Sequence, residues 1–158
     1  MQNFGARCVG SGRAPITIEA EAKCRAAPGA IFSLLRDSET WPRWSFFNKA
    51  ELERGGDGER HGVGAIRSFA TRLTQTREEL TELDPDRKLG YVLLSGLPLR
   101  NYRAEVRLHS IDDGGTTIRW AASFECAFGT GWFWRIVVQQ TLSKISAQLT
   151  AAAEAGLS

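Results

Sequence analysis

Apolar and polar residues alternate along the first regular stretch of the chain. The sequence ITIEAEA begins at Ile16, and its period of two, continued to about Ala26, predicts a half-buried strand. Between Phe46 and Cys126 the chain has no long helical period and is interrupted by turn-forming sequences such as GGDG and DPD. We predict six further strands in this region, over residues 48–54, 63–72, 74–83, 88–95, 101–111 and 116–126.

Two short helices and one long helix are predicted from other spacings. The first begins near Pro28, which suits a first helical turn, and Ile31 starts its apolar face. A second helix of one turn lies within residues 37–45 and is expected to end at Pro42. After residue 131, apolar residues recur at steps of four, four, three, four and three, which predicts a long amphipathic helix. Its stripe consists of Trp134, Val138, Leu142, Ile145, Leu149 and Ala152.

The order of these elements predicts an α+β fold. Strands joined by tight turns form an antiparallel sheet, and the lack of crossover helices excludes a doubly wound α/β fold. A seven-stranded sheet must cover its apolar face, and the long C-terminal helix is the element large enough to do so. We therefore expect the sheet to curl around that helix, with the two short helices following the first strand.

The length and composition indicate one domain. The chain has 158 residues, of which 42% are apolar and 24% charged, as in an ordinary globular protein. Residues 1–14 lack periodicity and are expected to form a flexible leader, so the domain covers residues 15–158. Five Trp and eight Phe provide large, weakly polar side chains that suit a core or the lining of a cavity.

Charge and cysteine content narrow the possible partners. The net charge is only +2 and the basic residues are scattered, which argues against nucleic acid as a partner. No stretch is long and apolar enough for membrane insertion, and no signal peptide is recognisable. Three cysteines without a CxxC pair indicate neither a disulfide framework nor a zinc site, which favours the reducing cytoplasm. We expect no cofactor or metal, and a monomer or homodimer.

Four segments carry a resemblance to a known family: SETWPRW (38–44), GVGAIRSF (62–69), EELTELDPDRKLGY (78–91) and GGTTIRW (114–120). With the order of elements, they resemble the START-like, helix-grip (SRPBCC) superfamily, in particular its polyketide cyclase/dehydrase branch, over residues 16–154. Relatives include the birch pollen allergen. The resemblance implies a cavity between sheet and long helix for lipid or polyketide-like small molecules. It does not imply one reaction, because members include cyclases, lipid carriers, hormone receptors and binding proteins.

Strand parity predicts which side chains face this cavity. In the last strand Trp120 and Phe124 share a face, and the same rule turns Tyr102 inward and leaves His109 in solvent. The candidate ligand-binding residues are Trp41, Trp44, Arg67, Phe69, Glu78, Tyr91, Leu93, Tyr102, Trp120, Phe124, Trp134, Val138 and Leu142.

Arg67 is the most informative of these candidates. It shares a face with Val63, Ala65 and Phe69, so it is predicted to point into the interior, where a guanidinium needs a partner. Glu78 on the neighbouring strand is the expected partner. The pair is either a polar anchor for a ligand carbonyl or carboxylate, or a purely structural ion pair.

Aromatic residues mark two further places. Trp41 and Trp44 flank a proline on the second short helix, and they form either a gate at the cavity mouth or a plug that caps the core. The sequence WFW at 132–134 starts the long helix. Since consecutive helical residues cannot all face one way, at least one of the three is expected to be exposed. Three interpretations stay open for it: a membrane contact, a contact with a second copy, or an ordinary exposed aromatic side chain.

Three functions remain open from the sequence. The first is binding of a hydrophobic small molecule; the second is a cyclase-type enzyme in which Arg67 polarises a carbonyl and Glu78, Tyr91 or Tyr102 moves a proton. The third is an interaction module with a filled core. GxSxG, Walker and HExxH motifs are missing, and Cys126 has no evident base, so no residue is assigned as catalytic.

Overall fold

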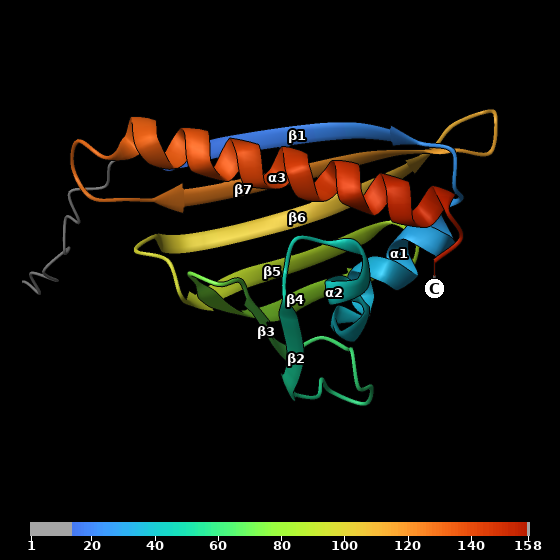
Figure 1. Cartoon of the computed structure of the whole chain (residues 1–158), viewed down its shortest axis with the longest axis horizontal. Helices are drawn as coiled ribbons and strands as arrows, with labels where there is room; N and C mark the ends of the chain where they lie inside the picture. Colours follow the sequence, from blue (N-terminus) through green and yellow to red (C-terminus); the bar gives the residue numbers. More distant parts are fainter. Residues whose placement is uncertain (1–13, 158) are drawn as a thin grey trace, which may run out of the picture.

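A computed structural model describes residues 14–157 as a single sheet covered on one face by helices (Figure 1). The strands lie in the order β1-β7-β6-β5-β4-β3-β2, and all neighbours are antiparallel. Most of the expected leader, residues 1–13, lies outside the described residues. The elements are β1 (Ile16–Cys24), α1 (Pro28–Arg36), η1 (Ser38–Thr40), α2 (Trp41–Trp44), β2 (Lys49–Arg54), β3 (Ile66–Ala70), β4 (Gln75–Asp84), β5 (Lys88–Ser95), β6 (Arg100–Ser110), β7 (Thr116–Glu125) and α3 (Gly131–Glu154).

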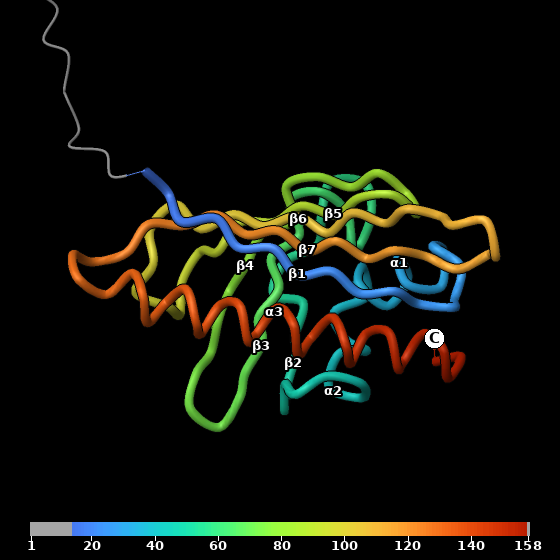
Figure 2. The backbone as a smooth tube through the Cα atoms, turned by 90° about the horizontal axis from the view of Figure 1, so that it is seen from above, coloured from blue at the N-terminus to red at the C-terminus, as the bar shows by residue number. Residues whose placement is uncertain are grey.

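The long helix α3 closes the inner face of the sheet, as the sequence predicts. Figure 2 shows the sheet curling toward the side that α3 occupies, with β1 running beside the helix. The helical stripe is buried from Val138 to Ala152, whereas Trp134 at its start is half-buried. The Phe46 backbone N–H donates to Gln148 Oε1 at 3.0 Å, which ties the helix to the segment after α2.

Most predicted boundaries differ from the structure by one or two residues, and two differences change the interpretation, the first at the start of β3. The predicted strand begins at residue 63, but Val63 is 41% exposed and lies before the strand. Gly64 has φ +86°, and the Ala65 N–H donates to the Gly62 carbonyl at 3.1 Å, so the chain turns before it becomes extended. Strand parity therefore holds from Ala65 onward and is wrong for Val63.

The second difference concerns Pro42, which was expected to end the short helix. It lies instead in the first turn of α2, where its missing N–H costs no hydrogen bond. The carboxylate of Asp37 accepts a hydrogen bond from the Glu39 N–H at 3.1 Å and so caps η1, which leads into α2. The helix ends at Ser45, where the backbone becomes extended.

Burial of the inner-face side chains decreases along the molecule in one direction. Leu89 on β5, Leu108 on β6 and Leu149 on α3 are all buried beside α1. At the other ends of the same three elements, Leu93, Tyr102 and Trp134 are only partly buried. We call the region of the loops 71–74, 96–99 and 126–130 the open end, and the region beside α1 the closed end.

The loops of the open end lie next to one another. Arg100 pairs with Glu125 and Arg77 pairs with Ser95, so the ends of β7, β6, β5 and β4 are aligned. Gly96 has φ +109°, and a Cβ at this position would collide with the Gln75 carbonyl oxygen. Glycine at position 96 thus allows the loop between β5 and β6 to pack against the start of β4.

Candidate ligand-binding cavity

A polar row lies on the inner face of the sheet, where β3 and β4 approach α1. Arg67 on β3 lies opposite Glu78 on β4, and Glu78 lies opposite Leu93 on β5. Arg67 is fully buried and Glu78 is 7% exposed, so both charged side chains point into the interior as the sequence predicts. The strands therefore bring the two candidates together by register alone.

Arg67 is held on every side by protein atoms. Its Nε donates to Glu78 Oε1 at 3.0 Å, and Nη2 donates to the same oxygen. Its Nη1 donates to the carbonyl of Leu35 in α1 at 2.9 Å. The rings of Trp41 and Phe69 lie 5.3 and 5.2 Å from the guanidinium carbon. Arg67 is therefore enclosed and orients Glu78 rather than facing the interior space itself.

Glu78 is the less enclosed residue of this pair. Both hydrogen bonds from Arg67 end on Oε1; within residues 14–157 no donor reaches Oε2, which is not fully buried. Burial raises the pKa of Glu78, while the charge and hydrogen bonds of Arg67 oppose this effect. The second oxygen is thus an accessible acceptor in apolar surroundings, on a carboxyl group that is able to exchange a proton.

Two tyrosines lie next to this carboxylate. Trp120 Nε1 donates to the Tyr91 hydroxyl oxygen at 3.2 Å. The Tyr91 and Tyr102 rings are 6.5 Å apart, and Tyr102 stacks on Phe124 at 6.0 Å. Burial raises the pKa of both tyrosines, so they stay protonated as hydroxyl groups. The interior therefore combines a carboxylate acceptor with two phenol groups.

Trp41 and Trp44 form a plug instead of an open rim. They are 3% and 9% exposed, and the Trp41 ring lies 4.5 Å from that of Phe69. Each indole N–H is bonded inside the protein: Trp41 to the Leu34 carbonyl at 3.0 Å, and Trp44 to Thr40 Oγ1 at 3.2 Å. Of the two interpretations left open by the sequence, this packing favours the cap on the core.

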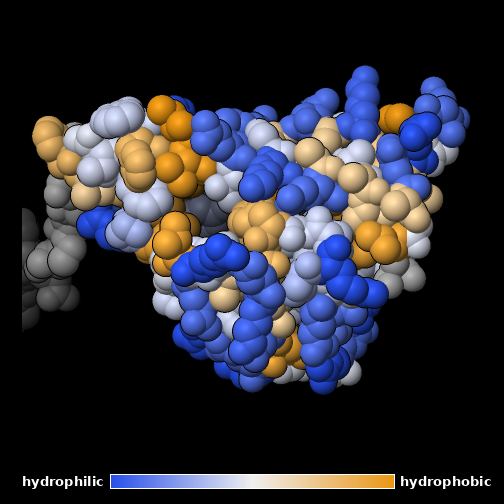
Figure 3. Space-filling model, viewed as in Figure 1, coloured by the Kyte–Doolittle hydropathy of each residue, from blue (hydrophilic) through white to orange (hydrophobic). Residues whose placement is uncertain are grey.

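A hollow in the surface marks the mouth of the interior. Figure 3 shows it between α3 and the β3–β4 hairpin. The half-buried candidates Leu93, Tyr102 and Trp134 belong to the elements around this region, while Val138 and Leu142 are buried further along α3. The candidate residues thus divide into the polar row, the aromatic plug, the partly open side chains near the mouth and a buried group. The buried group consists of Phe69, Tyr91, Trp120, Phe124, Val138 and Leu142.

A second groove, of about 480 Å³, crosses the opposite, outer face of the sheet. It lies where Gly90 and Ala121 provide little or no side chain, and Val92, Arg103 and Glu105 surround it. The sequence did not predict this groove. Strand parity predicts only that its residues face solvent, and it does not show where small residues leave a depression in that face. It is a competing place for a ligand, on the face away from α3.

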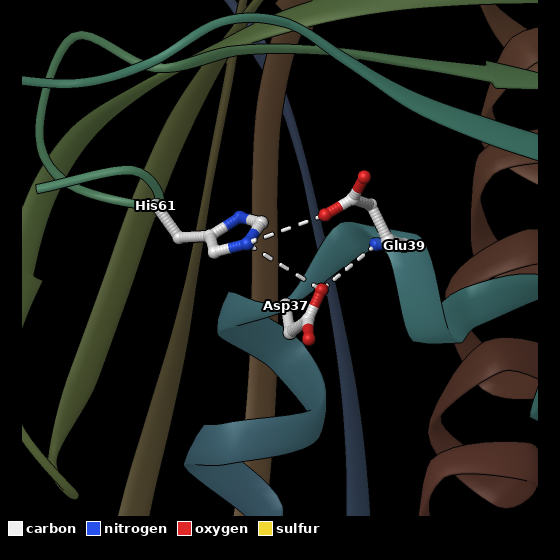
Figure 4. A group of neighbouring side chains, drawn as sticks. All are labelled: Asp37, Glu39 and His61. Atoms are coloured by element: carbon white, nitrogen blue, oxygen red, sulfur yellow. Dashed lines mark hydrogen bonds and ion pairs between the residues drawn. The ribbon is translucent and has the colours of Figure 1, made fainter.

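A third cluster lies outside both grooves. His61 Nε2 is 3.6 Å from Asp37 Oδ1 and 3.7 Å from Glu39 Oε2 (Figure 4). Three potential ligand atoms within 4.8 Å of one another have the composition of a metal site. Arg60 Nη2, however, donates to both oxygens of Glu39 at 2.8 Å, and Asp37 caps η1. Arg60 thus neutralises Glu39, and the backbone N–H orients Asp37. The cluster therefore has a structural role, in which it joins η1 to the β2–β3 loop.

The remaining histidine follows the prediction from strand parity. His109 is exposed on β6, outside the interior. Within residues 14–157, no helix combines the length and apolarity that a membrane span requires.

The curled seven-stranded sheet, the long C-terminal helix and the two short helices after β1 define the START-like, helix-grip class. The family model described as "Polyketide cyclase / dehydrase and lipid transport" matches residues 15–154, and the chain belongs to this family. No curated protein matches the sequence.

Solved structures agree with this fold. A START superfamily protein from Mycobacterium smegmatis is 12% identical with a TM-score of 0.76, covering 88% of this chain and 97% of its own. The protein XoxI from Bacillus cereus is 16% identical with a TM-score of 0.70, covering 89% and 95%. An uncharacterised protein from Bacillus thuringiensis is 15% identical with a TM-score of 0.72, covering 87% and 98%. At these identities the likeness concerns the fold.

Proposed function

We propose that this protein binds a hydrophobic or amphipathic small molecule, lipid-like or polyketide-like, between the inner face of the sheet and α3. The observation that carries the proposal is the Glu78 carboxylate on the inner face of the sheet, which Arg67 holds by one oxygen while no described donor reaches the other. Ligand pockets characteristically combine apolar walls with a few oriented polar groups. The family's description, which includes lipid transport, supports the same substrate class.

The arrangement indicates how such a ligand lies. Its apolar part extends along Val138 and Leu142 toward the mouth, where Leu93 is half-buried. A hydroxyl group donates to Glu78 Oε2, or a carbonyl accepts a hydrogen bond from a tyrosine hydroxyl. The decrease in burial toward the open end supports this arrangement over the alternative of an interaction module with a filled core.

Two neighbouring residues allow a sharp test. Leu93 lies opposite Glu78 on the inner face, whereas Val92 lines the groove on the outer face of the same strand. Binding of the fluorescent apolar probe N-phenyl-1-naphthylamine is measured for Leu93→Trp and Val92→Trp. Because a tryptophan at position 93 fills the mouth, we expect at least tenfold weaker binding for Leu93→Trp and wild-type binding for Val92→Trp. The opposite result would place the probe on the outer face and contradict the proposal.

A cyclase-type reaction is the second candidate, and the raised pKa of Glu78 favours it. In that case Glu78 exchanges the proton, a tyrosine hydroxyl stabilises the enolate oxygen, and Arg67 positions Glu78 instead of touching the carbonyl. Turnover of a poly-β-keto thioester would then show a bell-shaped pH profile that Glu78→Gln abolishes. Retained turnover in Glu78→Gln would contradict this assignment.

The compartment is proposed on the basis of the thiols. Cys24 and Cys126 are both free, which suits a reducing cytoplasm.

A further inference from the structure

The exposed apolar side chains gather at the open end. Among the described residues eight large apolar side chains are exposed, and six of them belong to the loops of this end or the adjoining residues. Trp132 is 68% exposed, Phe133 46% and Leu73 94%. The six are Leu73, Leu94, Phe128, Trp132, Phe133 and Ile136. Figure 3 shows apolar side chains over the first turns of α3.

The charge of this end is mainly positive. The loops 71–74, 96–99 and 126–130, together with Arg100 and residues 131–136, contain three arginines, and the acidic residue beside them is Glu125, which lies opposite Arg100 at the end of β7. Arg72, Arg100 and Arg135 are exposed, and no described carboxylate forms an ion pair with them. Each lies next to an apolar residue in the sequence.

The closed end is different. Its turns carry the exposed acidic residues Asp84 and Asp86 between β4 and β5, and Asp112 and Asp113 between β6 and β7. The two ends of the molecule therefore differ: the open end is apolar and cationic, and the closed end carries acidic turns.

We infer that the open end is a surface for peripheral docking on an anionic lipid bilayer. Trp and Phe side chains partition into the interfacial region of a bilayer, and nearby arginines are attracted to anionic headgroups. The charge complementarity favours a lipid surface over a second copy of this chain, which would bring like charges together. Docking in this orientation places the hollow between α3 and the β3–β4 hairpin in the half of the molecule nearer the bilayer (Figures 1 and 3).

Sedimentation with vesicles tests this inference without any bound ligand. The full chain is mixed with vesicles of phosphatidylcholine alone or with added phosphatidylglycerol. We expect binding to the anionic vesicles that weakens with added NaCl. Trp132→Ser/Phe133→Ser should abolish it, and Arg72→Gln/Arg135→Gln should weaken it about fivefold for each arginine removed.

Matched variants control for general effects. Val63→Ser/Leu157→Ser removes exposed apolar side chains outside the open end, and Arg87→Gln/Arg119→Gln removes the same charge elsewhere; both should bind vesicles like the wild type. Circular dichroism checks that each variant is folded, and binding of N-phenyl-1-naphthylamine should be unchanged in Trp132→Ser/Phe133→Ser, which separates docking from the proposed function. Undiminished vesicle binding by that variant, or equal binding to both vesicle types, overturns the inference. The inference is also overturned if the wild type does not bind vesicles and is a dimer, while the Trp132→Ser/Phe133→Ser variant is a monomer.

Discussion

Arg67 directs two hydrogen bonds to a single oxygen of Glu78, so that the carboxylate is fixed while no donor among the described residues reaches its second oxygen. The cost of burying the guanidinium is offset by Glu78, by the Leu35 carbonyl and by two aromatic rings. The ion pair thus has a structural part, Arg67, and a second part, Glu78, that we propose contacts a ligand. The two interpretations of the pair that the sequence leaves open are compatible in this geometry.

Arg67→Met should destabilise the protein strongly. Loss of one partner leaves the other charge buried, which typically costs about 3–5 kcal/mol. Glu78→Leu added to Arg67→Met should recover most of this loss, because no unpaired charge remains. Chemical denaturation at neutral pH measures both. Arg77→Met is the control, since its pair with Glu53 is partly exposed and should matter much less. Equal losses in the two single variants would show that the Arg67 pair is not buried as described.

The raised pKa of Glu78 predicts a pH dependence of stability with a definite sign. The folded protein holds the Glu78 proton more tightly than the unfolded chain, whose pKa is near 4.5. The contribution of this group is therefore fully present below pH 4.5 and is lost as the pH rises through the folded pKa. The difference in free energy of unfolding between wild type and Glu78→Gln should decrease over that interval. A difference that increases with pH would mean that Arg67 dominates and the folded pKa is lowered.

Tyr102→Phe should separate polar from apolar recognition. The substitution keeps the ring that stacks on Phe124 and removes only the hydroxyl group. If this hydroxyl forms a hydrogen bond with a ligand, Tyr102→Phe should bind a long-chain alcohol about threefold to tenfold more weakly than the wild type does. The affinity for the alkane that has a methyl group in place of the alcohol's hydroxyl should not change. Displacement of the naphthylamine probe measures both affinities. Thr17→Val, which removes a hydroxyl from the outer groove, is the control and should change neither. Equal effects on both ligands would remove Tyr102 from polar recognition.

Gly96→Ala should destabilise the fold more than Gly114→Ala. Both glycines have positive φ, but a Cβ at position 114 meets open space while one at position 96 meets the Gln75 carbonyl. Gly114→Ala is expected to cost about 1 kcal/mol for the backbone conformation alone. Gly96→Ala should cost at least about twice as much, because the loop must also move away from β4. Thermal denaturation compares them, and similar melting temperatures would contradict the close packing of these loops.

Sequence periodicity predicted the sheet and α3 because both are regular over long distances. In β7 the alternation from Thr116 to Glu125 is uninterrupted, so parity placed Trp120 and Phe124 correctly. The pairing of Arg67 with Glu78 followed from adjacent strands and the need to neutralise a buried charge. Where a glycine turn interrupts the strand, at Gly62–Gly64, the same rule was wrong for Val63.

Features that depend on tertiary contacts could not be predicted. The burial of Trp41 depends on Phe69 and Trp120, which come from β3 and β7. The outer groove is lined by Gly90 of β5 and Ala121 of β7, which lie on either side of Glu105 in the strand register. The contact between His61 and Asp37 connects the β2–β3 loop with the end of α1. None of these contacts has a local signal in the sequence.

Intermolecular NOEs between a bound long-chain alcohol and the protein's methyl groups test the central claim most directly. The method reports contacts of about 5 Å and therefore distinguishes the two faces of β5, which strand alternation separates. Binding between sheet and α3 predicts NOEs from the acyl chain to the methyl groups of Leu93, Val138 and Leu142. NOEs confined to Val92 on the outer face would contradict it.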